Sequence, residues 1–512
     1  MMIKPTLLAS TVALVLTGCG GGGGGGGGST PSVSYFKANF VYLDSVAKDQ
    51  NGKGNCRVYD YDYDSESETP EIPTYKVIGY TASPLTGYSI VVHDSDGSVV
   101  STYTKSDWGT ANFYRIKQSE VPSGGYVSFV VKTDGNSYQI STYSKDLLPD
   151  TFSMYAGGSY TGGNYSSAST SCITGGNTTY GSESGNFLPI GTSDLYGFNT
   201  YGQDLDDLTN YYSSLYYVAD GGISFYAPQD KAVLGVEYSK NGDDIDSLVG
   251  YKFLSLSDIS ATTSVELTDV DDTLDWTLPD TSTVTLSQAN IHVYKSTTGA
   301  VLWQPLTTSA DGTYGYATAV GDSNYYLNLE GTYGDWSFSY ADVMSNPGIE
   351  EDATSTISDV VTSDSVTLSI ASCSLSAYGS CIDIATDAPD FSKAIQRVEI
   401  SNKPDSGSVN QVIYSDYSDQ VPIFSFDGSN EEVSSILVSG STQKIYLSLL
   451  AQNGSTLNDA FLYNHQDLNA RLEPSVSSFQ DAIPMLSSFK DHSAQQNLFK
   501  YKSHILLQAS SD

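Results

Sequence analysis

The stretch YSIVVH at residues 88–93, followed by the turn-forming DSDG at residues 94–97, decides the fold class of this chain. β-branched and aromatic residues fill the first segment, and Asp, Ser and Gly favour a tight turn after it. Segments with the same period-two pattern recur at residues 126–132, 232–238, 264–268, 290–294, 325–330, 365–370, 397–400 and 444–450. Short strands separated by turn residues predict an all-β protein with several β-sandwich domains in tandem.

Composition excludes two classes of protein. The chain of 512 residues has 39% hydrophobic and 12% aromatic residues, enough to bury several cores, so wholesale disorder is excluded. Lys and Arg number 23 against 59 Asp and Glu, which gives a net charge of -36. A chain so poor in basic residues cannot neutralise a row of phosphates, and no nucleic-acid partner is expected.

An internal repeat marks two of the expected domains. Residues 104–113 and 307–316 share the pattern T-x-S-x-x-G-T-x-x-aromatic, and each copy follows a strand, a turn ending in Gly97 or Gly299, and a second strand. This order resembles the carboxypeptidase-regulatory-like and bacterial Ig-like modules, which are small Ig-like or transthyretin-like sandwiches. The resemblance implies a spacer or adhesion unit without catalytic residues. Two unrelated hairpins that share turn chemistry are the alternative.

Shifts in composition divide the chain into successive segments. A signal peptide (1–18) and a tether with a lipidated cysteine (19–32) come first. The expected domains are a β-sandwich with the first repeat copy (33–186), a β domain (187–280), a β-sandwich with the second copy (281–350), a further β-sandwich (351–474) and a C-terminal packing segment (475–512).

The N-terminus predicts a lipid anchor. Lys4 precedes a short apolar run at residues 7–16, which is far shorter than the roughly 20 residues of a membrane-spanning helix. The following LTGC, ending at Cys19, resembles the lipobox of bacterial lipoproteins, and Gly20 after the cysteine resembles their outer-membrane sorting pattern. The resemblance implies acylation of Cys19 and a Gram-negative outer-membrane location, with the body at the cell surface on a poly-glycine tether. An ordinary cleaved secretion signal is the alternative.

Four further cysteines suit an oxidising compartment, where they form disulfides rather than stay reduced. Of the three possible pairings, we expect Cys373–Cys381, which closes a turn-like segment, and therefore Cys56–Cys172. A zinc site is the alternative, but no closely spaced cysteine pair or nearby histidine supports it.

Clusters of acidic residues are candidate calcium sites, because Ca²⁺ prefers several oxygen ligands. The candidates are Asp94, Asp96, Asp243, Asp244, Asp246, Asp269, Asp271, Asp272 and Asp275, with residues 204–207 as a further cluster. The alternative is a solvated acidic surface that keeps the protein soluble.

Function is less sharply indicated. The sequence contains no familiar catalytic motif, and its five histidines are scattered, which predicts strand-surface positions rather than a site. Trp108 and Trp303 are candidate glycan platforms, and the 39 tyrosines suit interfaces. We therefore expect a non-enzymatic, lipid-anchored surface protein with an envelope-structural or adhesive role, in one form S-layer-like self-assembly. The alternative is a glycan-binding accessory lipoprotein of a degradative system, and a hydrolase is a third possibility.

Overall fold

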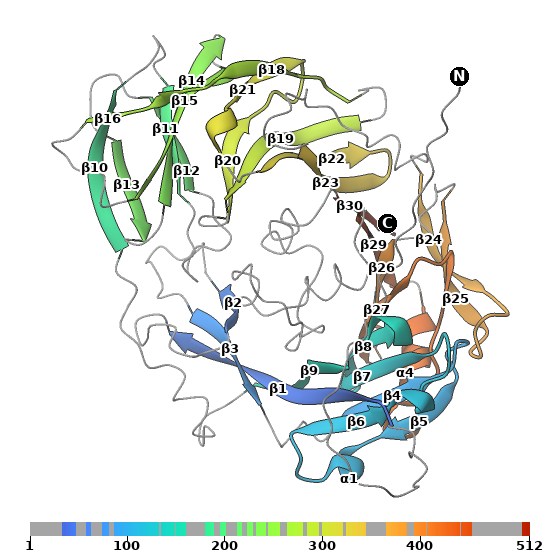
Figure 1. Ribbon diagram of the computed structural model, residues 1–512. Helices are drawn as coiled ribbons and strands as arrows, with labels where there is room; N and C mark the ends of the chain where they lie inside the picture. Colours follow the sequence, from blue (N-terminus) through green and yellow to red (C-terminus); the bar gives the residue numbers. More distant parts are fainter. Residues whose placement is uncertain are drawn as a thin grey trace, which may run out of the picture.

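The computed structural model confirms that the chain is all-β, with several sheets (Figure 1). It describes residues 33–47, 58–62, 74–80, 87–132, 135–148, 150–159, 180–188, 195–200, 212–217, 223–228, 232–241, 244–255, 264–279, 284–295, 299–320, 324–344, 365–386, 394–405, 407–440, 442–452 and 504–511. Within these ranges the helices are short: α1 (Lys105–Trp108), η2 (Gln118–Glu120), η3 (Lys145–Leu147), η5 (Thr318–Val320), η6 (Gly428–Asn430) and α4 (Glu432–Val438). None of the helices in the described part is long and apolar enough to cross a membrane.

The largest sheet of the described part has twelve strands, which follow an arc in Figure 1. Its strands, in order across the sheet, are β20 (Gly299–Pro305), β19 (Val284–Lys295), β22 (Asn324–Tyr333), β23 (Trp336–Met344), β30 (His504–Ser510), β29 (Lys444–Gln452), β26 (Ile395–Asn402), β27 (Ser408–Asp416), β8 (Ser137–Ser144), β7 (Tyr126–Lys132), β4 (Tyr88–His93) and β5 (Val99–Tyr103). Neighbours pair antiparallel except β27 and β8, which run parallel. The sheet joins strands from four of the expected segments, whose boundaries stay predictions.

The two repeat copies occupy equivalent places at opposite ends of this sheet. The order β5-β4-β7-β8 at one end corresponds to β20-β19-β22-β23 at the other. In each copy the segment after the hairpin leaves the sheet: β6 (Phe113–Lys117) pairs with β1 (Tyr35–Ala47), and β21 (Gly312–Tyr316) pairs with β18 (Asp272–Trp276). The shared sequence pattern therefore coincides with a shared strand topology.

The sheet is covered on both faces where β4 lies. On one face pack β1, β6 and β9 (Thr151–Ser159), with β3 (Thr74–Tyr80) and β2 (Val58–Asp62) continuing that layer. On the other pack α4 and a small sheet of β24 (Thr367–Ser372), β25 (Ser380–Ala385) and β28 (Gln420–Pro422). Ile90 and Val92 enter the first core and Val91 enters the second. Burial on both faces explains why YSIVVH is apolar nearly throughout.

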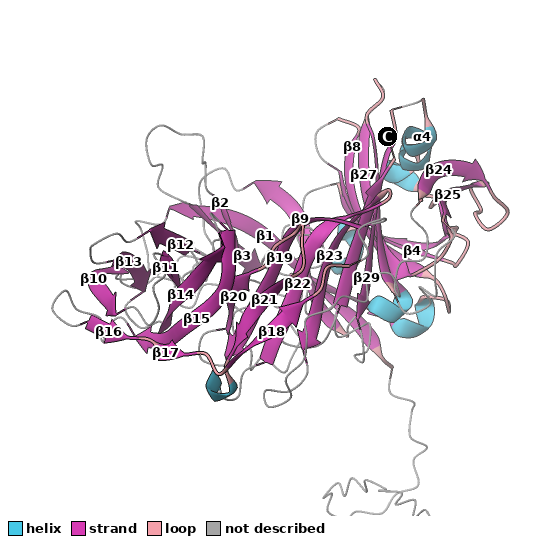
Figure 2. Ribbon diagram, turned by 90° about the horizontal axis from the view of Figure 1, so that it is seen from above, coloured by secondary structure: helices cyan, strands magenta, loops and turns pink. Residues whose placement is uncertain are grey.

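The remaining strands form two smaller sheets on the other side of the molecule from β24 and β25 (Figure 2). One contains β13 (Ile223–Pro228), β10 (Tyr180–Leu188) and β16 (Ser264–Glu266). The other contains β12 (Tyr212–Tyr217), β11 (Leu195–Thr200), β14 (Ala232–Asn241), β15 (Asp244–Ser255) and β17 (Thr268–Asp269).

Gln304 joins three sheets at the β20 edge. Its Oε1 accepts hydrogen bonds from Leu248 N of β15 at 2.8 Å and Gly315 N of β21 at 3.0 Å. Its Nε2 donates to Thr313 O at 2.8 Å and Asp246 O at 3.3 Å. The amide is buried and uses its four hydrogen-bonding positions, so it acts as a cross-sheet clamp.

Candidate functional site

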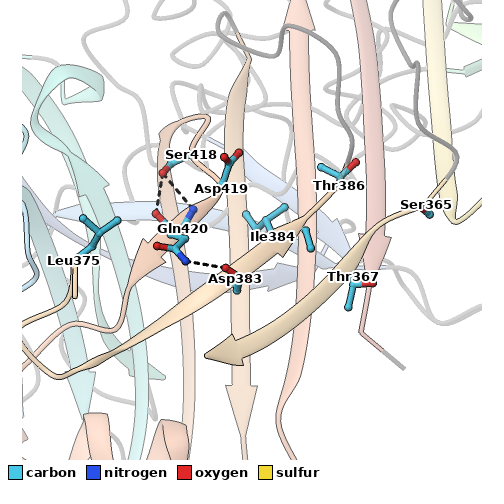
Figure 3. Close-up of a pocket in the computed structure, with 10 residues that line it drawn as sticks. Ser365, Thr367, Leu375, Asp383, Ile384, Thr386, Ser418, Asp419 and Gln420 are labelled. Carbon is cyan, nitrogen blue, oxygen red and sulfur yellow. Dashed lines mark hydrogen bonds between the residues drawn. The ribbon is translucent and has the colours of Figure 1, made fainter. Parts of the chain in front are cut away.

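An open pocket of about 740 Å³ lies between the β24–β25 hairpin and the turn that precedes β28 (Figure 3). This volume falls within the range of small-molecule sites, roughly 300–1,000 Å³. The lining combines hydroxyl, carboxylate and amide side chains with a few aliphatic ones: Ser365, Thr367, Leu375, Asp383, Ile384, Ala385, Thr386, Ser418, Asp419 and Gln420.

The wall formed by the hairpin is held firmly in place. The expected disulfide is present and joins Cys373 to Cys381, where β24 pairs with β25. The turn between them reaches back to the body: Ala377 N donates to Asp96 O at 2.8 Å, and Ser376 Oγ donates to Ile423 O at 2.9 Å. These bonds fix the hairpin relative to β28 and to the β4–β5 turn.

The polar side chains in the pocket are ordered by bonds among themselves. Gln420 Nε2 donates to Asp383 Oδ1 at 2.9 Å, and Ser418 Oγ donates to the carbonyl of Gln420 at 2.8 Å (Figure 3). Thr386 Oγ1 is shielded from solvent and has no hydrogen-bond partner among the described residues. The pocket therefore holds fixed acceptors and one hydroxyl whose bonding capacity the described protein groups leave unused.

The electrostatic character of the pocket is acidic. Asp383 and Asp419 line it, and no Lys, Arg or His occurs among the described residues of its lining. Burial, together with a hydrogen bond to Asp419, raises the pKa of Tyr417 well above its usual value, so the phenol stays protonated and donates to that carboxylate. Such a site favours ligands that donate hydrogen bonds and disfavours anions.

The hairpin turn beside the pocket exposes two large apolar side chains. Leu375 is 55% exposed and Tyr378 36% exposed. In Figure 2 β24 and β25 lie at one end of the molecule, away from β10 and β13 at the other. We call residues 374–379 the hairpin tip.

The structure does not bring the described acidic candidates together as a metal site. Asp94 Oδ1 and Asp96 Oδ1 accept backbone N–H groups of their own turn, from Ser95 and Ser98. Asp271 accepts hydrogen bonds from Thr318 N and Oγ1, and these bonds lower the pKa of its carboxyl. Asp269 and Asp272 are exposed on β17 and β18.

The other acidic candidates leave calcium binding untested. Asp246 Oδ2 accepts from Ser239 Oγ, Asp275 lies on the exposed side of β18, and only the backbone of Asp244 is described. Among the described residues no group of three His, Cys, Asp or Glu could hold a metal. Residues 204–207 and Asp243 lie outside the described residues, as do Cys19, Cys56 and Cys172. Calcium binding by this chain stays a prediction.

The glycan candidates are core residues, which corrects the expectation of exposed platforms. Trp108 is 6% exposed and packs against Phe40 and Tyr88, with ring centroids 5.1 and 5.9 Å away. Trp303 is fully buried and donates from Nε1 to Gly315 O at 2.7 Å. Neither ring presents a face on which a sugar could stack.

The histidines also depart from expectation, because His93 and His292 are buried rather than on a strand surface. His93 Nε2 lies 2.8 Å from Ser128 Oγ, a pairing that resembles a nucleophile and its base. Burial lowers the pKa of His93 to about 3, and no solvent reaches the pair. The contact belongs to a buried polar row that continues to Thr142 and Gln411.

Sequence patterns did not identify Asp383, Asp419 or Gln420. No motif marks these three residues in a chain with many acidic side chains, and only the pairing of β25 with β28 brings Asp383 beside Gln420.

No protein-family model matches the chain. A search of curated proteins likewise finds no match.

Proposed function

We propose that the chain is a non-enzymatic, lipid-anchored protein of a Gram-negative cell surface with an adhesive role. The observation that supports adhesion is the hairpin tip, where exposed Leu375 and Tyr378 stand beside a polar pocket on a disulfide-closed frame. Exposed apolar side chains rimmed by polar groups are typical of contact surfaces. The lipobox-like segment ending at Cys19 supports the anchor, and the following glycines would let the body stand off the membrane.

Cell adherence tests this proposal. We expect Leu375→Ser with Tyr378→Ser to lower adherence of expressing cells several-fold while the protein stays in the membrane fraction. Cys19→Ser should lower adherence by releasing the protein into the medium. Lys403→Ser with Asp405→Ser, an exposed pair on another loop, is the matched control and should adhere as wild type does. Full adherence by the tip variant would contradict the adhesive role.

S-layer-like self-assembly is the structural form of the same proposal. Electron microscopy of the purified protein, with and without calcium, would show ordered arrays if copies pack through acidic and tyrosine-rich faces. Single particles in both buffers would contradict assembly without affecting the adhesion test.

A glycan-binding accessory role is the second candidate, and the pocket favours it. Carboxylate, amide and hydroxyl groups converge there, and these groups are suited to recognising sugar hydroxyls. The tryptophans no longer support this role, so it depends on the pocket alone.

A further inference from the structure

We propose that the pocket between the β24–β25 hairpin and the turn before β28 binds a neutral hexose unit of a surface polysaccharide. The inference deepens the proposed adhesive role by naming its ligand class. The inference rests on the proposed adhesive role only for the statement that the sugar belongs to a surface polysaccharide. Sugar binding itself is measured directly with soluble probes.

Hydrogen-bonding capacity is the first step of the argument. Asp383 uses Oδ1 to accept from Gln420, and the described residues place no donor on its Oδ2. Asp419 supplies a second carboxylate, which also has room beyond its bond from Tyr417. Acceptors of this kind require a ligand rich in donors, and the hydroxyls of a pyranose ring meet that requirement.

Shape and apolar contact are the second step. Leu375 and Ile384 line the same pocket as the carboxylates. A pyranose has an apolar C–H face as well as its hydroxyl edge, so it can pack against Leu375 while its hydroxyls reach the aspartates.

Charge decides between classes of sugar. The described residues that line the pocket include two carboxylates and no cationic side chain, and such a lining repels a uronic acid, a sialic acid or a phosphorylated sugar. A hexose without charge is not repelled. The described lining offers few hydrogen bonds and contains no aromatic ring, which implies weak binding per site. Many anchored copies on one cell would strengthen this binding by multivalency.

The test uses the full-length protein in detergent and saturation-transfer NMR with methyl glycosides. We expect at least one of the methyl glucoside, galactoside and mannoside to bind. The matching methyl uronide, which differs by a carboxylate at C6, should bind at least tenfold more weakly. Absence of binding by all three neutral glycosides, or equal binding of the uronide, would overturn the inference. Binding of a methyl glucosaminide alone would overturn it as well, because the site would then be specific for an ammonium group.

Variants locate the binding. Asp383→Asn and Asp419→Asn should each weaken binding of the neutral glycoside about tenfold, because a neutral acceptor replaces a charged one. Asp405→Asn makes the same charge change on an exposed loop elsewhere and should bind as wild type does. Asp419 is exposed, so its variant is expected to fold normally, and an unchanged melting temperature checks this. Unchanged binding by both pocket variants would overturn the site.

The two proposals fail separately. Loss of adherence in the tip variant, without any sugar binding, would leave adhesion standing and reject the hexose site. Sugar binding that depends on Asp383 and Asp419, without any effect of the tip variant on adherence, would establish the site and reject the adhesive role of the tip.

Discussion

Replacing Gln304 with leucine is expected to destabilise the protein by at least about 3 kcal/mol. Leucine fills similar space but cannot hydrogen-bond, so Leu248 N, Gly315 N and Thr313 O would lose their partners in a buried junction. Each buried backbone group left unsatisfied costs about 1–3 kcal/mol. Urea unfolding followed by circular dichroism measures the effect as a lower midpoint.

The control for this variant is Gln288→Leu. Gln288 is exposed on β19, in the same sheet, and its replacement should change stability by no more than about 0.5 kcal/mol. Gly315→Ala tests the same junction from the other side and should also lower the urea midpoint, because a Cβ there would overlap the carbonyl oxygen of Leu248. If Gln304→Leu unfolds at the wild-type urea concentration, the three sheets do not depend on this clamp.

Local pattern was sufficient to predict strands, because alternation and turn residues are properties of neighbouring positions. YSIVVH forms β4, DSDG forms the turn after it, and the pattern shared by residues 104–113 and 307–316 coincides with a shared strand order. The Cys373–Cys381 bond was likewise predictable, since both cysteines lie on one short hairpin.

Burial depends on partners that lie far away in the sequence, and this is where the predictions failed. Trp108 was expected to be a glycan platform, yet Phe40 and Tyr88 enclose it. His93 is buried by Phe424, some 330 positions later, with ring centroids 5.0 Å apart. The pocket also depends on a distant contact, because β25 and β28 pair although β26 and β27 separate them in the sequence.

His93 leads to the second large prediction, a loss of stability in mild acid. The side chain is buried under Phe424 and Phe426, and its pKa falls from 6.5 to about 3, chiefly because burial disfavours the charged ring. The unfolded chain therefore binds a proton at this position more readily than the folded one. Its contribution to stability is complete above pH 6.5 and is lost as the pH falls toward 3.

Between pH 6.5 and 4.5 this single group should lower the free energy of unfolding by about 2 kcal/mol, and by about 4 kcal/mol near pH 3. The upper window isolates histidine, because ordinary carboxyl groups titrate mostly below it. His93→Gln removes the titration while keeping an amide that can bond to Ser128 Oγ. Urea midpoints across this window should therefore fall less steeply for His93→Gln than for wild type, and parallel curves would show that His93 does not govern the acid sensitivity.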